Sequence, residues 1–154
     1  MKNLIFISAL FFLLFQIACE DEQPNIYENC CSDLPVIDSV KLQNPVVSSG
    51  DTIEWAHVYI PNIFTVKTGN VDPGLDGLFM CFTDNRAVLQ VNAILIEDMQ
   101  GHLLFYNPNI APNDTQAAWN GLKDDGGYHF GEFKYLISIT FIDGQIKLYD
   151  GRAH

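Results

Sequence analysis

"EFKYLISITFIDGQIKLYDG", residues Glu132 to Gly151, is the stretch that decides the fold class of this chain. Its two halves, "LISITFI" and "QIKLY", are rich in β-branched and aromatic residues, which favour strands. Asp143-Gly144 between them is typical of a tight hairpin turn. The first half places five apolar side chains on one face: Phe133, Tyr135, Ile137, Ile139 and Phe141. The stretch therefore predicts two antiparallel strands, Glu132 to Ile142 and Gln145 to Tyr149.

The chain before this hairpin shows the same pattern. From Val36 onward no window has an apolar stripe of helical period, whereas short β-rich runs alternate with turn residues. The further predicted strands are Val36 to Leu42, Thr52 to Ile60, Leu78 to Phe82, Val88 to Ile96 and His102 to Tyr106. Turns are expected at Ser49-Gly50, Gln100-Gly101 and Asp125-Gly126-Gly127. We therefore predict that residues 36–154 form an all-β, immunoglobulin-like antiparallel β-sandwich of about seven strands, with Trp55 and Trp119 capping or filling its core.

The length and charge of the chain limit the number of domains and the classes of partner. The chain has 154 residues and 48% hydrophobic content, which suits one domain with a real core and a leader. Its formal net charge is −11, so nucleic acid would be repelled, and we expect no nucleic-acid partner. The same charge suits cations or basic partners, although most acidic surfaces are simply solvated.

The N-terminus has the pattern of a signal peptide. Lys2 is followed by an apolar run, Leu4 to Phe15, that is too short to cross a bilayer core of about 30 Å. Gln16, Ile17 and Ala18 then lead into Cys19, an arrangement that resembles a bacterial lipoprotein box. The resemblance implies that residues 1–18 are removed and that Cys19 carries the lipid. A soluble secreted protein with a spare cysteine is the alternative.

Three acids follow Cys19 directly: Glu20, Asp21 and Glu22. They resemble the surface-export signal of Bacteroidetes lipoproteins, which implies an outer-membrane protein facing the cell exterior. A solvated tether would need the same composition, and both interpretations can hold together. We expect residues 19–35 to form a lipidated, acidic and flexible tether.

The remaining cysteines are Cys30, Cys31 and Cys81. Adjacent cysteines rarely bridge each other, so the candidate disulfide joins Cys81 to one of the other two. Free buried thiols and an intermolecular bridge are the alternatives. The four histidines are scattered and predict no metal site: His57, His102, His129 and His154.

Four stretches resemble a known family when taken in order: "VYIPNIFT" (58–65), "ILIEDMQGHLLF" (94–105), "WNG" (119–121) and "GEFKYLISITFIDGQIKLYDG" (131–151). They are similar to the gliding motility-associated C-terminal domain, also called the type B sorting domain of the type IX secretion system of Bacteroidetes. The resemblance covers about residues 58–151. It implies a fold more than a chemistry.

One loop of this family is tight, whereas here it is stretched into "TVKTGNVDPGLDG". Asn70, Asp72 and Asp76 in this loop offer the hard oxygen ligands that Ca²⁺ favours, so they are candidate calcium ligands. An Asx-rich turn explains the same residues without a metal. No other cofactor is expected.

The family's sorting domain serves as a C-terminal passport on a large cargo, whereas we expect this chain to have a lipoprotein leader and no cargo. We therefore expect a stand-alone lipoprotein, anchored to the outer membrane, that acts as an accessory subunit with a protein partner there. No nucleophile elbow, metalloprotease motif or phosphate loop is present in the sequence, and Asp124-Asp125 suits a solvated turn better than a catalytic pair. The expected function is non-enzymatic.

A glycan-binding surface lipoprotein is the alternative function. Exposed aromatic rings beside polar groups suit such a role. The candidate platform consists of Tyr106, Trp119 and Tyr128, with Phe130 and three asparagines nearby: Asn107, Asn109 and Asn120. The competing interpretation is that these aromatic side chains pack in the core or in loops.

Overall fold

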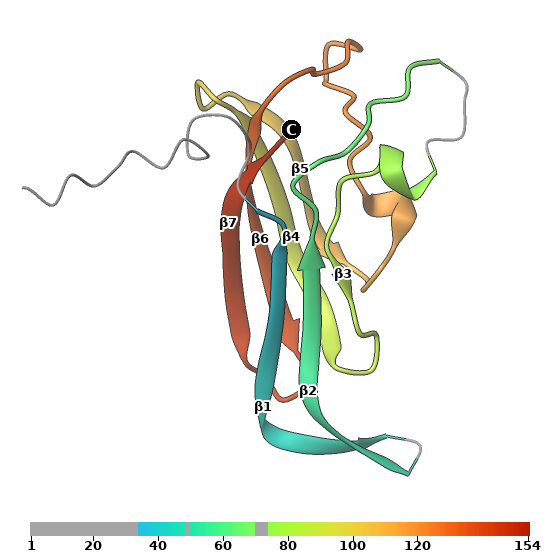
Figure 1. Cartoon of the computed structure of the whole chain (residues 1–154), viewed down its shortest axis with the longest axis vertical. Helices are drawn as coiled ribbons and strands as arrows, with labels where there is room; N and C mark the ends of the chain where they lie inside the picture. Colours follow the sequence, from blue (N-terminus) through green and yellow to red (C-terminus); the bar gives the residue numbers. More distant parts are fainter. Residues whose placement is uncertain (1–33, 49, 70–73) are drawn as a thin grey trace, which may run out of the picture. The chain divides into compact units, whose positions relative to one another are not determined.

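The computed structural model describes residues 34–48, 50–69 and 74–154 (Figure 1). In this part of the chain there are seven strands: β1 (Val36–Ser48), β2 (Asp51–Ile60), β3 (Phe82–Thr83), β4 (Val88–Asp98), β5 (Leu103–Ile110), β6 (Phe133–Phe141) and β7 (Ile146–Ala153). Two short 3-10 helices, η1 (Leu75–Gly77) and η2 (Thr115–Ala117), lie in the connections. One sheet has the order β1-β2-β3 and the other β5-β4-β6-β7, and all neighbours are antiparallel.

The predicted antiparallel β-sandwich of about seven strands is confirmed. The order β5-β4-β6-β7 matches the C′-C-F-G sheet of an immunoglobulin variable domain, counted in chain order. In the described residues, the other sheet has three strands, whereas the corresponding sheet of that domain has four. Its third strand, β3, precedes β4 in the chain, whereas the immunoglobulin fold takes the corresponding strand from the segment after C′.

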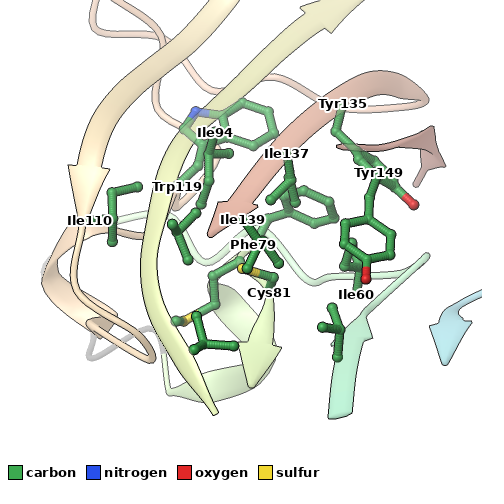
Figure 2. Close-up of a cluster of buried hydrophobic side chains, with 14 of the residues drawn as sticks. Ile60, Phe79, Cys81, Ile94, Ile110, Trp119, Tyr135, Ile137, Ile139 and Tyr149 are labelled. Carbon is green, nitrogen blue, oxygen red and sulfur yellow. The ribbon is translucent and has the colours of Figure 1, made fainter. Parts of the chain in front are cut away.

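The inner faces of both sheets form one hydrophobic core. Strand β6 alternates buried and outward residues along its whole length, and β2 does the same from Ala56 to Ile60. Aromatic rings fill the end of the core near Trp119: the Phe79 and Phe133 rings meet edge to face at 4.9 Å, and those of Trp119 and Phe133 at 5.0 Å. Figure 2 shows Trp119, Phe79 and Cys81 beside the isoleucines of β4 and β6.

Four predicted strands had wrong bounds, among them β7, which continues to Ala153 instead of ending at Tyr149. Strand β1 continues to Ser48 past a register shift between Lys41 and Val46, and β5 continues to Ile110 through Pro108. Proline is tolerated there because β5 is an edge strand. The run 78–82 supplies only Phe82 to a strand, because Phe79, Met80 and Cys81 are all buried and do not alternate between two faces.

The hairpin at Asp143-Gly144 is confirmed. Gly144 has φ of 87° and donates its N–H to the Phe141 carbonyl at 2.9 Å, while Phe141 N–H binds the Gln145 carbonyl at 2.8 Å. These bonds enclose a three-residue loop whose last residue is left-handed, a common hairpin type. The Asp143 carboxylate accepts the Gln145 N–H at 3.0 Å and stabilises the turn.

A polar clamp ties the two sheets together at the β1–β7 corner. The Tyr149 hydroxyl donates to Asp38 Oδ2 at 2.8 Å, and Lys147 Nζ donates to the same oxygen. The hydrogen bond from Lys147 leads the causes that hold the pKa of Asp38 below its ordinary value. Burial, together with the bond to Asp38, raises the pKa of Tyr149. The clamp therefore joins an ionised carboxylate to a neutral phenol across the sandwich.

Candidate interaction surfaces

The outer face of the four-stranded sheet carries an exposed apolar patch. Leu95 of β4 pairs with Tyr106 of β5 on one side and with Leu136 of β6 on the other, which makes a row across three strands. Leu148 and Ile146 of β7 pair with outward residues of β6, so they extend the same face. Tyr106 is 55% exposed and Leu148 61%. We call these five residues the apolar face; its desolvation against a partner would be favourable.

Polar side chains beside the apolar face are already hydrogen-bonded. Asn92 Nδ2 donates to Ser138 Oγ at 3.0 Å, and Thr140 Oγ1 donates to Asn92 Oδ1 at 2.9 Å. A partner that covers this part of the sheet therefore leaves these groups satisfied. Satisfied polar groups of this kind lower the cost of burying a surface.

One residue of the candidate glycan platform lies in the core, as the competing interpretation holds. Trp119 is only 1% exposed, because its ring packs against those of Phe64 and Phe133, with ring centroids 5.4 and 5.0 Å away. Tyr106 belongs to the apolar face, and Tyr128 pairs with Leu122 in the long β5–β6 connection. The three asparagines serve the fold: Asn107 binds the Ala117 carbonyl, Asn109 accepts from Gln90, and Asn120 accepts from the Leu122 N–H.

The structure explains the residues of the "WNG" motif by their role in the fold. The backbone of Trp119 exchanges two hydrogen bonds with Phe79, at 2.7 and 3.1 Å, and its indole N–H donates to the Leu122 carbonyl at 2.9 Å. Gly121 has φ of 86°, and a Cβ there would lie 2.9 Å from Val66 Cγ2. The motif therefore folds a tight turn around a buried indole, and the preference for tryptophan packing in the core is confirmed for Trp119.

The expectation that Trp55 caps or fills the core was wrong. Trp55 is 46% exposed on the outer face of the three-stranded sheet. His57 and Tyr59 follow it on the same face, because the residues between them are the buried Ala56 and Val58. Phe82 of β3 pairs with Tyr59, with their ring centroids 6.1 Å apart. We call Trp55, His57, Tyr59 and Phe82 the aromatic row.

The signal for the aromatic row was present in the sequence. "EWAHVYI" alternates Trp55, His57 and Tyr59 with the aliphatic residues Ala56, Val58 and Ile60. In a strand of period two, these two sets must face opposite sides. The aliphatic set fits the core better, so the alternation indicates that Trp55 lies on the outer face of the sheet.

Asp124 and Asp125 lie on an exposed turn, as expected. Asp125 Oδ1 accepts the Gly127 N–H at 2.8 Å, and Oδ2 accepts from Lys123 at 3.0 Å. These two bonds, that of Gly127 foremost, hold the pKa of Asp125 below its ordinary value. A general acid at neutral pH needs the opposite shift.

Cys81 lies in the core, and its burial raises the pKa of the thiol to about 12. Among the described residues its thiol is free. Cys30 and Cys31 lie outside the described residues, so the disulfide with Cys81 stays a prediction. A thiol in this environment is a poor nucleophile and packs as a small apolar group.

Several predicted site residues lie outside the described residues: Cys19, Glu20, Asp21, Glu22, Asn70 and Asp72. For Asp76, the structure describes the backbone only, in η1. The lipid attachment, the export signal and the calcium ligands therefore stay predictions. Within residues 34–48, 50–69 and 74–154, no group of three or more His, Cys, Asp or Glu side chains could hold a metal ion.

The described segments also contain no helix of the length and apolarity needed to span a bilayer. No family model, curated protein or solved structure matches the chain. The resemblance to the gliding motility-associated C-terminal domain therefore rests on the sequence motifs alone.

Proposed function

We propose that this chain is a non-enzymatic lipoprotein of the outer membrane that presents its β-sandwich at the cell surface as an interaction subunit of a larger complex. The single observation that carries the interaction role is the apolar face. The leader pattern, ending in Cys19 and followed by Glu20, Asp21 and Glu22, supports the location. The resemblance to the sorting-domain family suggests a complex linked to type IX secretion or gliding.

The apolar face suits a protein partner for two reasons. It combines one aromatic ring with four aliphatic side chains on a sheet surface, the composition of the desolvated centre of an interface. It also reaches both edge strands of its sheet, β5 and β7. An edge strand offers backbone groups for pairing with a partner strand.

Affinity purification from membranes under mild detergent, followed by mass spectrometry, tests the interaction. The wild-type chain at native abundance should bring a defined partner. Leu148→Asp should remove it, because a charge that is buried in an interface loses its water. The matched control is Phe130→Asp, which places the same charge at a 70% exposed ring outside the apolar face and should retain the partner. Recovery of the wild-type protein alone would refute the proposal.

A second experiment tests the anchor and the orientation. Metabolic labelling with a palmitate analogue should mark the wild-type chain and not Cys19→Ser. Protease treatment of intact cells should degrade the labelled protein, and replacing Glu20, Asp21 and Glu22 by Ala should protect it. A wild-type protein without label would refute the anchor, and a labelled, protected wild-type protein would refute the surface location.

A further inference from the structure

A second surface, on the opposite sheet, has a different chemistry. The aromatic row presents three rings and one imidazole along β2 and β3, each outward and anchored on a strand. The cross-strand partners on β1 fix two of them: Lys41 Nζ lies 5.9 Å from the Trp55 ring centroid, and Ser39 Oγ lies 3.0 Å from His57 Nδ1. The row is therefore preorganised: Trp55, His57 and Tyr59 lie outside the core, and Phe82 is partly buried and packs against it.

Two open depressions follow the aromatic row. One, of about 430 Å³, is lined by Trp55, His57, Asp84 and Arg86, among others. The other, of about 270 Å³, is lined by His57, Tyr59, Phe82 and Asp84, among others. Because His57 and Asp84 line both, the two depressions are neighbours and form one elongated, shallow site. Such a shape suits an extended ligand better than a compact one.

The charged groups of this site include one arginine that lies between two carboxylates. Arg86 lies 3.8 Å from Asp51 and 3.6 Å from Asp84. Asp84 is held in place, because its carboxylate accepts the Arg86 N–H at 2.9 Å and its backbone carbonyl accepts two further N–H groups, from Ala87 and Val88. The site thus offers fixed donors and acceptors beside ring faces, and the acids of its larger depression, Asp51, Glu54 and Asp84, outnumber its one base, Arg86.

We infer that the aromatic row and its two depressions bind a neutral oligosaccharide. Sugar rings present C–H groups on one face, and these meet the negative face of an aromatic ring favourably. Their hydroxyls need both donors and acceptors, which Asp84, Arg86 and His57 supply. An anionic polymer is disfavoured by the chain's net charge of −11. The depressions are also less apolar than the desolvated centre of a protein interface, because Asp51, Glu54, Asp84 and Arg86 line the larger one.

Titration with linear neutral oligosaccharides of glucose, mannose and xylose tests the inference. Calorimetry and tryptophan emission measure the binding. At least one should bind with a dissociation constant of about 1 mM or tighter and should change the emission of Trp55. Trp55→Ala and Tyr59→Ala should each weaken binding by about tenfold or more. Trp55→Phe should retain most of the affinity, because it keeps a ring at the same position.

Tyr106→Ala is the matched control, since it removes an exposed ring from the other sheet and should bind as the wild type does. A thermal melt of each variant separates lost folding from lost binding. The inference is overturned if no neutral oligosaccharide binds at about 10 mM, if an oligogalacturonate binds more tightly, or if correctly folded Trp55→Ala and Tyr59→Ala both retain wild-type affinity. Protein capture that requires Trp55, with no sugar bound, would overturn it in favour of a peptide site.

Discussion

At the scale of single residues, Asp38 shows how a few polar atoms hold the two sheets in register. Its carboxylate on β1 receives both Lys147 and Tyr149 from β7, so one oxygen serves two donors of the opposite sheet. Lys147 is also 5.4 Å from the Tyr149 ring centroid, which adds a cation–π contact to the same corner. Because β1 and β7 belong to different sheets, the loss of these contacts should loosen the packing of the two sheets at this corner first.

Asp38→Asn should destabilise the fold by about 1 kcal/mol at pH 7, a modest value because Lys147 is partly solvated. The pKa of Asp38 is lowered in the folded state, so its contribution is present above the ordinary pKa of 3.8. It is lost as the pH falls through the lowered folded value. Urea midpoints of the wild type and the variant should therefore differ at pH 7 and converge as the pH falls through the lowered folded value. A difference that persists unchanged in acid would contradict the role of the ionised carboxylate.

Gly151 is required by a close approach. It pairs with Tyr135 on the inner face, and a Cβ at this position would lie 2.5 Å from the Tyr135 hydroxyl and 2.8 Å from Cζ. Tyr135 is buried and its ring is rigid, so it has little room to move. Gly151→Ala should cost about 1–3 kcal/mol in the free energy of unfolding. Asp150→Ala, at the exposed neighbouring position, should cost less than about 0.5 kcal/mol, and equal losses would show that the contact with Tyr135 is not the cause.

At the scale of elements, substitutions of Gly144 test the turn that the sequence predicts in the β6–β7 hairpin. Gly144 closes the loop in a left-handed conformation, with φ of 87°, and no atom lies within 4 Å of the position that a Cβ would take there. Gly144→Ala therefore adds backbone strain without a steric clash, and we expect a loss of about 1 kcal/mol. Gly144→Asn should cost less, because asparagine tolerates this conformation better. Chemical denaturation of the three proteins measures the order, and Asn costing as much as Ala would contradict the explanation.

The elements differ in how far the sequence predicts them. The hairpin and β2 are predictable because local turn chemistry and period two agree with the final packing. The start of β3 is not predictable from the sequence. The run before it, "LFMC", is apolar at every position, and the burial of this run depends on contacts with Trp119 and Phe133, which lie far along the chain. For the sites, alternation alone would have identified Trp55 as exposed. The apolar face required the pairing of β4 with both β5 and β6, which no local pattern contains.

At the scale of the whole molecule, the two outer faces of the sandwich carry different kinds of side chain. The four-stranded sheet presents Leu136, Leu148 and their neighbours, and the three-stranded sheet presents the aromatic row. A sandwich keeps these faces on opposite sides, so a partner on the apolar face leaves the proposed sugar site accessible. The Leu148→Asp variant should therefore lose its protein partner and retain sugar binding.

The two sheets should unfold as one unit. Ala56, Val58 and Ile60 of β2 share their core with Ile94 of β4 and Ile137 of β6, so neither inner face stays buried if the other sheet is lost. Trp55→Phe changes an exposed ring and leaves Trp119, buried among core aromatics, as the sole tryptophan. In urea, with a reductant present, the emission of Trp119 and the far-ultraviolet circular dichroism of this variant should give one common midpoint. They should also give one slope, of about 1–3 kcal/mol per molar urea. If the circular dichroism falls at lower urea than the Trp119 emission, the three-stranded sheet detaches first, and the single-core description is wrong.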